Sequence, residues 1–151
     1  MEIEGVVISK RRIIEDDRGS IRHIMKSSDS AFTKFGEVYC STIYPGRVKG
    51  WHLHSLMTLN YSVLFGKIRF ILFDGRENSP TFGGIQEIIM SPNNHCSITV
   101  PPGVWNGFQG LGQDESYVIN MTDIPHDPYE ISRMDPHDND IIDFNWSQVD
   151  R

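Results

Sequence analysis

Residues 59–73 read LNYSVLFGKIRFILF, and this stretch decides the fold class. It consists of two runs rich in aromatic and β-branched side chains, residues 59–65 and 68–73, on either side of Gly66-Lys67. Runs of this length and composition are typical of β-strands that are buried on at least one face. The two-residue break between them predicts a hairpin with a short turn.

Four further segments have the same character: residues 37–44, 85–90, 96–100 and 116–121. The first of them alternates in the way a half-buried strand does, and Pro45-Gly46 ends it. Short strands about 10 residues apart, separated by Gly, Pro or Asn, are typical of a β-sandwich or barrel. The sequence shows no repeat and no linker, so we predict a single all-β domain over residues 1–151.

Composition and charge exclude several classes of protein. The chain has 151 residues, with 14 Lys and Arg against 20 Asp and Glu, which gives a net charge of −6 at pH 7. Binding to nucleic acid or to an anionic membrane needs clustered positive charge, so neither partner is expected. No apolar run of the sequence is long enough to span a membrane, and the first residues lack the features of a signal peptide. We therefore expect a cytoplasmic protein.

The first cluster of chemically active side chains is KGWHLH at residues 49–54. Alternate residues of a strand face the same side, so His52 and His54 are expected to point together into a barrel or together out of it. Two histidines in this arrangement can ligate a metal ion, exchange protons with a substrate, or pack as structural residues. The spacing alone leaves these alternatives open.

A second cluster, VPPGVWNGF at residues 100–108, places a sharp Pro-Gly turn before a strand with Asn106 and Phe108 on one face. Together the two clusters resemble the two motifs of the cupins, a glycine followed by His-x-His and a later Pro-x-Gly turn. A metal-binding cupin would add a glutamate and a third histidine, where this chain has Leu59 and Asn106. Two imidazoles and an amide make a poor site for zinc or iron, so no metal and no other cofactor is expected.

Five stretches, in the same order along the chain, resemble motifs of the dTDP-4-dehydrorhamnose 3,5-epimerase family of nucleotide-sugar enzymes. They are DDRG at residues 16–19, KGWH at 49–52, NSPTFG at 78–83, PPGVWNGF at 101–108, and a closing pair formed by residues 122–123 and 135–146. The resemblance covers nearly the whole chain. It implies a cupin double-stranded β-helix, that is, a jelly-roll barrel, which forms a homodimer and needs no metal ion.

The resemblance also implies an activity and assigns residues to it. The implied reaction is epimerisation at C3 and/or C5 of a nucleotide-linked 4-keto-6-deoxy sugar, as used in polysaccharide biosynthesis. Such a reaction needs a base that removes a proton beside the ketone, and His52 aligns with the family's catalytic histidine. Arg18 and Lys49 align with positions that hold the nucleotide diphosphate. The remaining candidates for contact with the substrate are Trp51, Asn106, His23 and Arg69.

Three catalytic groups of the family have no match in this chain. The lysine that stabilises the enolate aligns with Leu59, and the tyrosine that donates the second proton aligns with Ile119. The aspartate that orients the histidine belongs to a C-terminal segment which this sequence lacks. Tyr117 lies two residues before Ile119, hence on the same strand face, and we name it with His52 and His54 as a candidate catalytic residue.

Two alternatives to an epimerase remain open. In the related nucleotide-sugar 3,4-ketoisomerases, two histidines of a Gly-x-His-x-His motif move a proton between adjacent carbons, and residues 50–54 are similar to that motif. In this interpretation His54 is a second proton carrier beside His52. The other alternative is a cupin that binds a nucleotide sugar without converting it, because the family's lysine, tyrosine and aspartate are not matched.

Overall fold

The structure, a computed structural model, describes residues 1–147. Within this range it contains β-strands and no helix, and so no helical segment that could cross a membrane. The strands are β1 (Val7–Lys10), β2 (Ile13–Asp16), β3 (Gly19–Arg22), β4 (Glu37–Ile43), β5 (Val48–His54), β6 (Leu59–Phe65), β7 (Ile68–Asp74), β8 (Ile85–Met90), β9 (Cys96–Val100), β10 (Val104–Gly110), β11 (Ser116–Thr122) and β12 (Ile131–Arg133).

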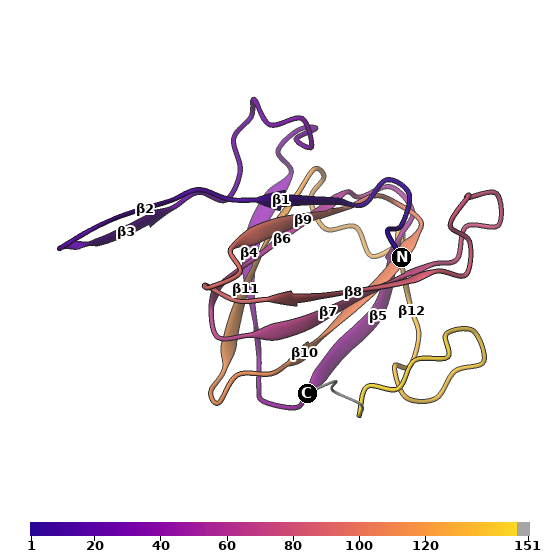
Figure 1. The fold of residues 1–151 in the computed structure, drawn as a ribbon. Helices are drawn as coiled ribbons and strands as arrows, with labels where there is room; N and C mark the ends of the chain where they lie inside the picture. Colours follow the sequence, from indigo (N-terminus) through magenta and orange to yellow (C-terminus); the bar gives the residue numbers. More distant parts are fainter. Residues whose placement is uncertain (148–151) are drawn as a thin grey trace.

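Two antiparallel sheets of five strands each face one another (Figure 1). Sheet 1 has the strand order β1-β9-β6-β11-β4, and sheet 2 has the order β12-β5-β10-β7-β8. Apolar side chains of both sheets are buried between them and form the main core, which includes Ile43, Val63, Phe70, Leu72, Ile98, Phe108 and Val118. This architecture confirms the predicted all-β fold, the cupin double-stranded β-helix or jelly-roll barrel.

The strands predicted from periodicity are confirmed to within one residue at their ends. The predicted hairpin at Gly66-Lys67 is wrong, because β6 belongs to sheet 1 and β7 to sheet 2. The chain crosses between the sheets here, and the backbone N–H of Lys67 donates to Ser116 Oγ at 3.0 Å. Gly66 has a φ of 84°, and a Cβ at this position would lie 2.2 Å from that hydroxyl, so the crossing requires a glycine.

A second apolar cluster covers the outer face of sheet 2, because the segment that follows β12 packs against it. Ile71 and Phe73 of β7 meet Ile142 and Trp146 of this segment. Trp51 of β5 lies in the same cluster, with its ring centroid 5.0 Å from that of Trp146. Sheet 2 is therefore covered by apolar side chains on both faces, and only part of its inner face is left to form a site.

The hairpin of β2 and β3 projects away from the two sheets (Figure 1). Its two strands pair only with each other. Three isoleucines of this hairpin, Ile13, Ile14 and Ile21, are exposed by 40%, 41% and 62%. Ile14 and Ile21 are register partners and form an exposed apolar pair on one face of the hairpin, whereas Ile13 lies on the other face.

Candidate active site

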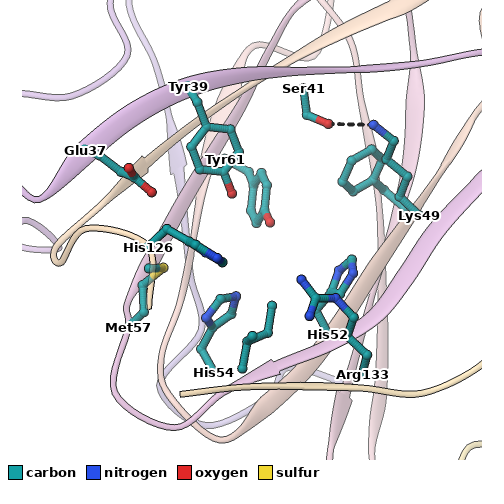
Figure 2. A pocket seen from close by; sticks show the side chains of 12 residues that line it. Glu37, Tyr39, Ser41, Lys49, His52, His54, Met57, Tyr61, His126 and Arg133 are labelled. Atoms are coloured by element: carbon teal, nitrogen blue, oxygen red, sulfur yellow. Dashed lines mark hydrogen bonds between the residues drawn. The ribbon is translucent and has the colours of Figure 1, made fainter. Parts of the chain in front are cut away.

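A cavity of about 380 Å³ opens between sheet 1 and sheet 2 (Figure 2). Its volume is in the range of cavities that bind small molecules. Both sheets and the loop that follows β11 contribute to the lining, which consists of Glu37, Tyr39, Ser41, Lys49, His52, His54, Met57, Tyr61, Phe108, His126, Ile131 and Arg133.

The wall formed by sheet 2 carries Lys49, His52 and His54, all from β5. The two strands that flank β5 fix the backbone at His52. On one side Arg133 of β12 is the register partner of His52. On the other side Asn106 of β10 is its partner, and Asn106 Nδ2 donates to the carbonyl oxygen of His52 at 3.2 Å. The catalytic candidate therefore sits on a central part of the sheet.

Two cations lie on the same side of the cavity as His52 (Figure 2). Lys49 reaches across to β4, where its Nζ donates to Ser41 Oγ at 3.0 Å. Arg133 lies on the other side of His52, at the end of β12. An ammonium and a guanidinium placed in this way suit an anionic ligand such as a diphosphate.

The imidazole of His52 is held uncharged by its surroundings. Burial lowers the pKa of His52 to about 4, and the neighbouring Arg133, His54 and Lys49 contribute to the shift by disfavouring a further positive charge. At neutral pH the ring therefore has one nitrogen with a free lone pair. The ring is thus in the proton-accepting form, but a pKa of about 4 makes it a weaker base than an imidazole that titrates near neutrality.

His54 forms a buried pair with Glu130, a residue of the loop before β12. His54 Nδ1 is hydrogen-bonded to Glu130 Oε1, and the two side chains are 9% and 3% exposed. The backbone N–H groups of Leu56 and Met57 each donate to Glu130 Oε2 at 3.2 Å. Burial by itself would raise the pKa of Glu130, but these hydrogen bonds, that of His54 first, lower it below its ordinary value. The pair fixes the ring of His54 in the wall.

The wall formed by sheet 1 carries two phenols, Tyr39 of β4 and Tyr61 of β6, which point into the cavity (Figure 2). Asn120 of β11 lies between them and donates from Nδ2 to the Tyr39 hydroxyl at 2.8 Å. Burial raises the pKa of Tyr39 and that of Tyr61 above the ordinary value, so both phenols are protonated at neutral pH. Within residues 1–147, no group of three His, Cys, Asp or Glu side chains is placed to hold a metal ion.

The sequence profile of the dTDP-4-dehydrorhamnose 3,5-epimerase family matches residues 1–151. The chain belongs to this family. A solved structure described as a dTDP sugar isomerase from Desulfovibrio desulfuricans is 40% identical to the chain, with a TM-score of 0.92 over 98% of this chain and 94% of that one. The fold and the predicted class of enzyme, a nucleotide-sugar epimerase or isomerase, are thereby confirmed.

Two further relatives match over nearly their whole length. The spore coat polysaccharide biosynthesis protein SpsL of Bacillus subtilis is 29% identical over 146 residues, which cover 96% of this chain and 97% of that protein. The probable low-salt glycan biosynthesis epimerase Agl13 of Haloferax volcanii is 29% identical over 151 residues, with 96% of this chain and 95% of that protein covered.

The structure corrects the placement of Tyr117, which the sequence predicts beside the candidate catalytic histidine, His52. Tyr117 is 41% exposed on the outer face of sheet 1, where its ring lies 5.8 Å from that of Phe65. The physical reason is strand alternation: Val118 and Asn120 of β11 face inward, so Tyr117 and Ile119 face outward. The family's tyrosine position, as aligned from the sequence, does not reach the cavity.

Two predicted substrate contacts, Trp51 and Arg69, also lie outside the cavity, on the covered outer face of sheet 2. Trp51 is fully buried against Trp146. Arg69 Nη2 donates to Gln109 Oε1 at 3.0 Å and to the carbonyl oxygen of Trp146 at 2.7 Å. The two side chains therefore anchor the C-terminal segment. Asn106, a third predicted contact, is 1% exposed and supports the backbone of His52 instead of lining the cavity.

Arg18 and His23 are far from the cavity of their own chain. Arg18 lies at the turn of the projecting hairpin, where its Nη2 pairs with Asp16 at 2.7 Å. His23 follows β3, and its carbonyl oxygen accepts a hydrogen bond from His95 Nε2 at 2.7 Å. Neither side chain can contact a ligand held in this cavity by the same chain.

Sequence reasoning missed several residues of the cavity. Glu37, Tyr39 and Ser41 alternate along β4, and this period-two pattern could have placed them on one face. Arg133 comes from a short strand where no periodicity marks a partner, and its place follows only from the pairing of β12 with β5. Glu130, which holds His54 without lining the cavity, comes from the loop before that strand.

We predict that Glu130→Ala lowers the free energy of unfolding by about 3 kcal/mol at pH 7, because a buried imidazole and two backbone N–H groups lose their acceptor. Glu87→Ala, which removes an exposed carboxylate of β8, is the matched control and should change it by less than about 0.5 kcal/mol. Because the pKa of Glu130 is lowered on folding, its contribution is present above the ordinary value of 4.5 and is lost as the pH falls through the lowered value. Urea unfolding at several pH values measures both effects, and equal stability of the two variants at pH 7 would contradict the role of Glu130.

Proposed function

We propose that this chain is an epimerase that acts at C3 and/or C5 of a nucleotide-linked 4-keto-6-deoxy sugar, with His52 as the base. The observation that carries the proposal is the placement of the His52 imidazole in the cavity wall, with two cations, Lys49 and Arg133, that suit a diphosphate in the same lining. The family name and the isomerase relatives support the same ligand class. Relatives named for polysaccharide and glycan biosynthesis support that cellular role.

The cavity can support each step of such a reaction. His52 removes the proton from the carbon beside the ketone, which leaves an enolate. The enolate needs a positive or hydrogen-bonding group close to its oxygen. Leu59, at the position of the family's lysine, is buried in the main core and cannot serve. Arg133, the register partner of His52, brings a guanidinium to the same place from β12, while Lys49 remains for the diphosphate.

A 3,4-ketoisomerase is the second candidate function, and the placement of His54 favours it. His52 and His54 both line the cavity from one strand, as required for two groups that pass a proton between adjacent carbons on one face of a sugar. A cupin that binds the sugar without converting it is the third candidate. It is favoured by the lack of a lysine at Leu59.

The three candidates give different products in D₂O. We expect the protein, incubated with dTDP- or GDP-linked 4-keto-6-deoxy sugars, to incorporate deuterium at C3 or C5 with inversion, as followed by NMR. His52→Asn should slow exchange by about 10²- to 10⁴-fold, the usual loss when a general base is removed. His137→Asn changes an exposed histidine outside the cavity and is the control. A carbonyl that moves to C3 would indicate the ketoisomerase. Binding of the sugar without exchange would indicate the non-catalytic cupin. Exchange at the full rate by His52→Asn would contradict the role of His52 as the base.

We further propose a homodimer in which the hairpin of β2 and β3 packs against the second copy. This would bury Ile13, Ile14 and Ile21 and would give Arg18 a ligand to bind in the partner's cavity. Light scattering should give twice the 17.3 kDa of one chain, and Ile14→Glu with Ile21→Glu should halve that mass. A monomer at micromolar concentration would contradict this assembly. The cytoplasmic location stays a prediction.

A further inference from the structure

Inversion at a carbon needs two groups, because the proton that leaves from one face must be replaced from the other. If His52 is the base, as proposed above, the second group must come from the wall opposite β5. Tyr117 is excluded by its position on the outer face of sheet 1. His54 lines the same wall as His52, since it lies two residues further along the same strand.

Sheet 1 presents two phenols to the cavity, Tyr39 and Tyr61, together with Glu37 and Ser41 of β4. Asn120 of β11 is the register partner of Tyr39 on β4 and of Tyr61 on β6, so the three side chains lie side by side on the inner face. The residues on the same face before and after Asn120, Val118 and Thr122, have no group that titrates. Figure 2 shows both phenol oxygens directed into the space that His52 and His54 border from below.

We infer that Tyr39 is the acid that protonates the enolate carbon on the face opposite His52. Its hydroxyl oxygen accepts a hydrogen bond from Asn120 Nδ2 at 2.8 Å, so its own proton remains available for donation. Tyr61 is also hydrogen-bonded to Tyr39. When the proton leaves, the Tyr39 phenolate can accept hydrogen bonds from both Asn120 and Tyr61, which stabilise the charge.

Tyr39 suits this role better than Tyr61. Tyr39 is 43% exposed, so its phenol can contact a ligand, whereas Tyr61 is 6% exposed and packs against Phe70 and Phe108 in the main core. We therefore assign Tyr61 and Asn120 as positioning residues for Tyr39.

The proton balance closes without a cofactor. His52 takes a proton from the carbon, and the C–H electron pair moves into the enolate. The enolate then takes the proton of the Tyr39 hydroxyl at the same carbon, and the ketone is restored with inverted configuration. His52 is then an imidazolium and Tyr39 a phenolate. The transfer of one proton through solvent from His52 to Tyr39 returns the site to its starting state.

The test separates proton removal from inversion. Tyr39→Phe, incubated with a dTDP-linked 4-keto-6-deoxy sugar in D₂O, should still exchange the proton that His52 removes but should invert the carbon about 10²- to 10⁴-fold more slowly. Tyr61→Phe, which removes one hydrogen bond from the phenolate, should slow inversion by about tenfold, and mainly through kcat. Tyr117→Phe, the matched change of an exposed tyrosine, should invert like the unaltered protein.

Circular dichroism and thermal unfolding first establish that each variant is folded. The inference is overturned if folded Tyr39→Phe inverts the carbon at the unaltered rate. It is also overturned if His126→Asn loses inversion while Tyr39→Phe retains it. The inference also fails if Tyr39→Phe loses exchange and inversion to the same extent. Absence of any exchange with the unaltered protein overturns the proposed function, and this inference with it, whereas the other outcomes leave the role of His52 standing.

Discussion

The close approach of β5 and β10 governs how the site is built. A Cβ at Gly50 would lie 2.9 Å from the Cα of Gly107, so the two backbones can meet here only because both residues are glycine. Beyond this contact Trp51 enters the outer apolar cluster and His52 faces the cavity. The pairing with β12 then adds Arg133 next to the imidazole. Backbone packing thus places the imidazole of His52 beside the guanidinium of Arg133, and both the proposed ligand and the proposed reaction depend on that arrangement.

The sequence was a good guide to the strands and a partial guide to the site. Alternation and β-branched composition defined strands such as β6 and β9, because each buries a continuous apolar row. These patterns could not show that the chain crosses from sheet 1 to sheet 2 at Gly66, because a hairpin turn and a crossing between sheets both favour a glycine. Alternation placed His52 and His54 together, and the family resemblance added Lys49, which reaches the same side through an irregularity in the pairing of β5 with β10. Tyr117 was misplaced because β11 reverses the usual pattern: Tyr117, Ile119 and Met121 face outward, whereas the inner face is largely polar. Arg133 reaches the cavity through a long-range strand pairing, which no local pattern encodes, and Glu130 acts from the loop before that strand by holding His54.

Membership of the epimerase family does not fix the catalytic groups one by one. Leu59 occupies the lysine position and is 1% exposed in the main core, which removes a charge from sheet 1. Sheet 1 has instead a row of two phenols and an amide, and sheet 2 has a guanidinium and a buried histidine–glutamate pair. In our proposal His52 keeps the position of the family's base while the groups around it differ, and such changes let one fold serve related reactions.

The state of His52 is the central claim of this account, and an NMR titration of the imidazole measures it directly. The resonances of His52 should move with a midpoint at about pH 4 in the free protein, because burial and the neighbouring cations disfavour the imidazolium. Addition of dTDP should raise that midpoint, since its diphosphate would neutralise part of the positive charge of Lys49 and Arg133. A midpoint near 6.5 that nucleotide leaves unchanged would contradict both the neutral base and the anion site beside it.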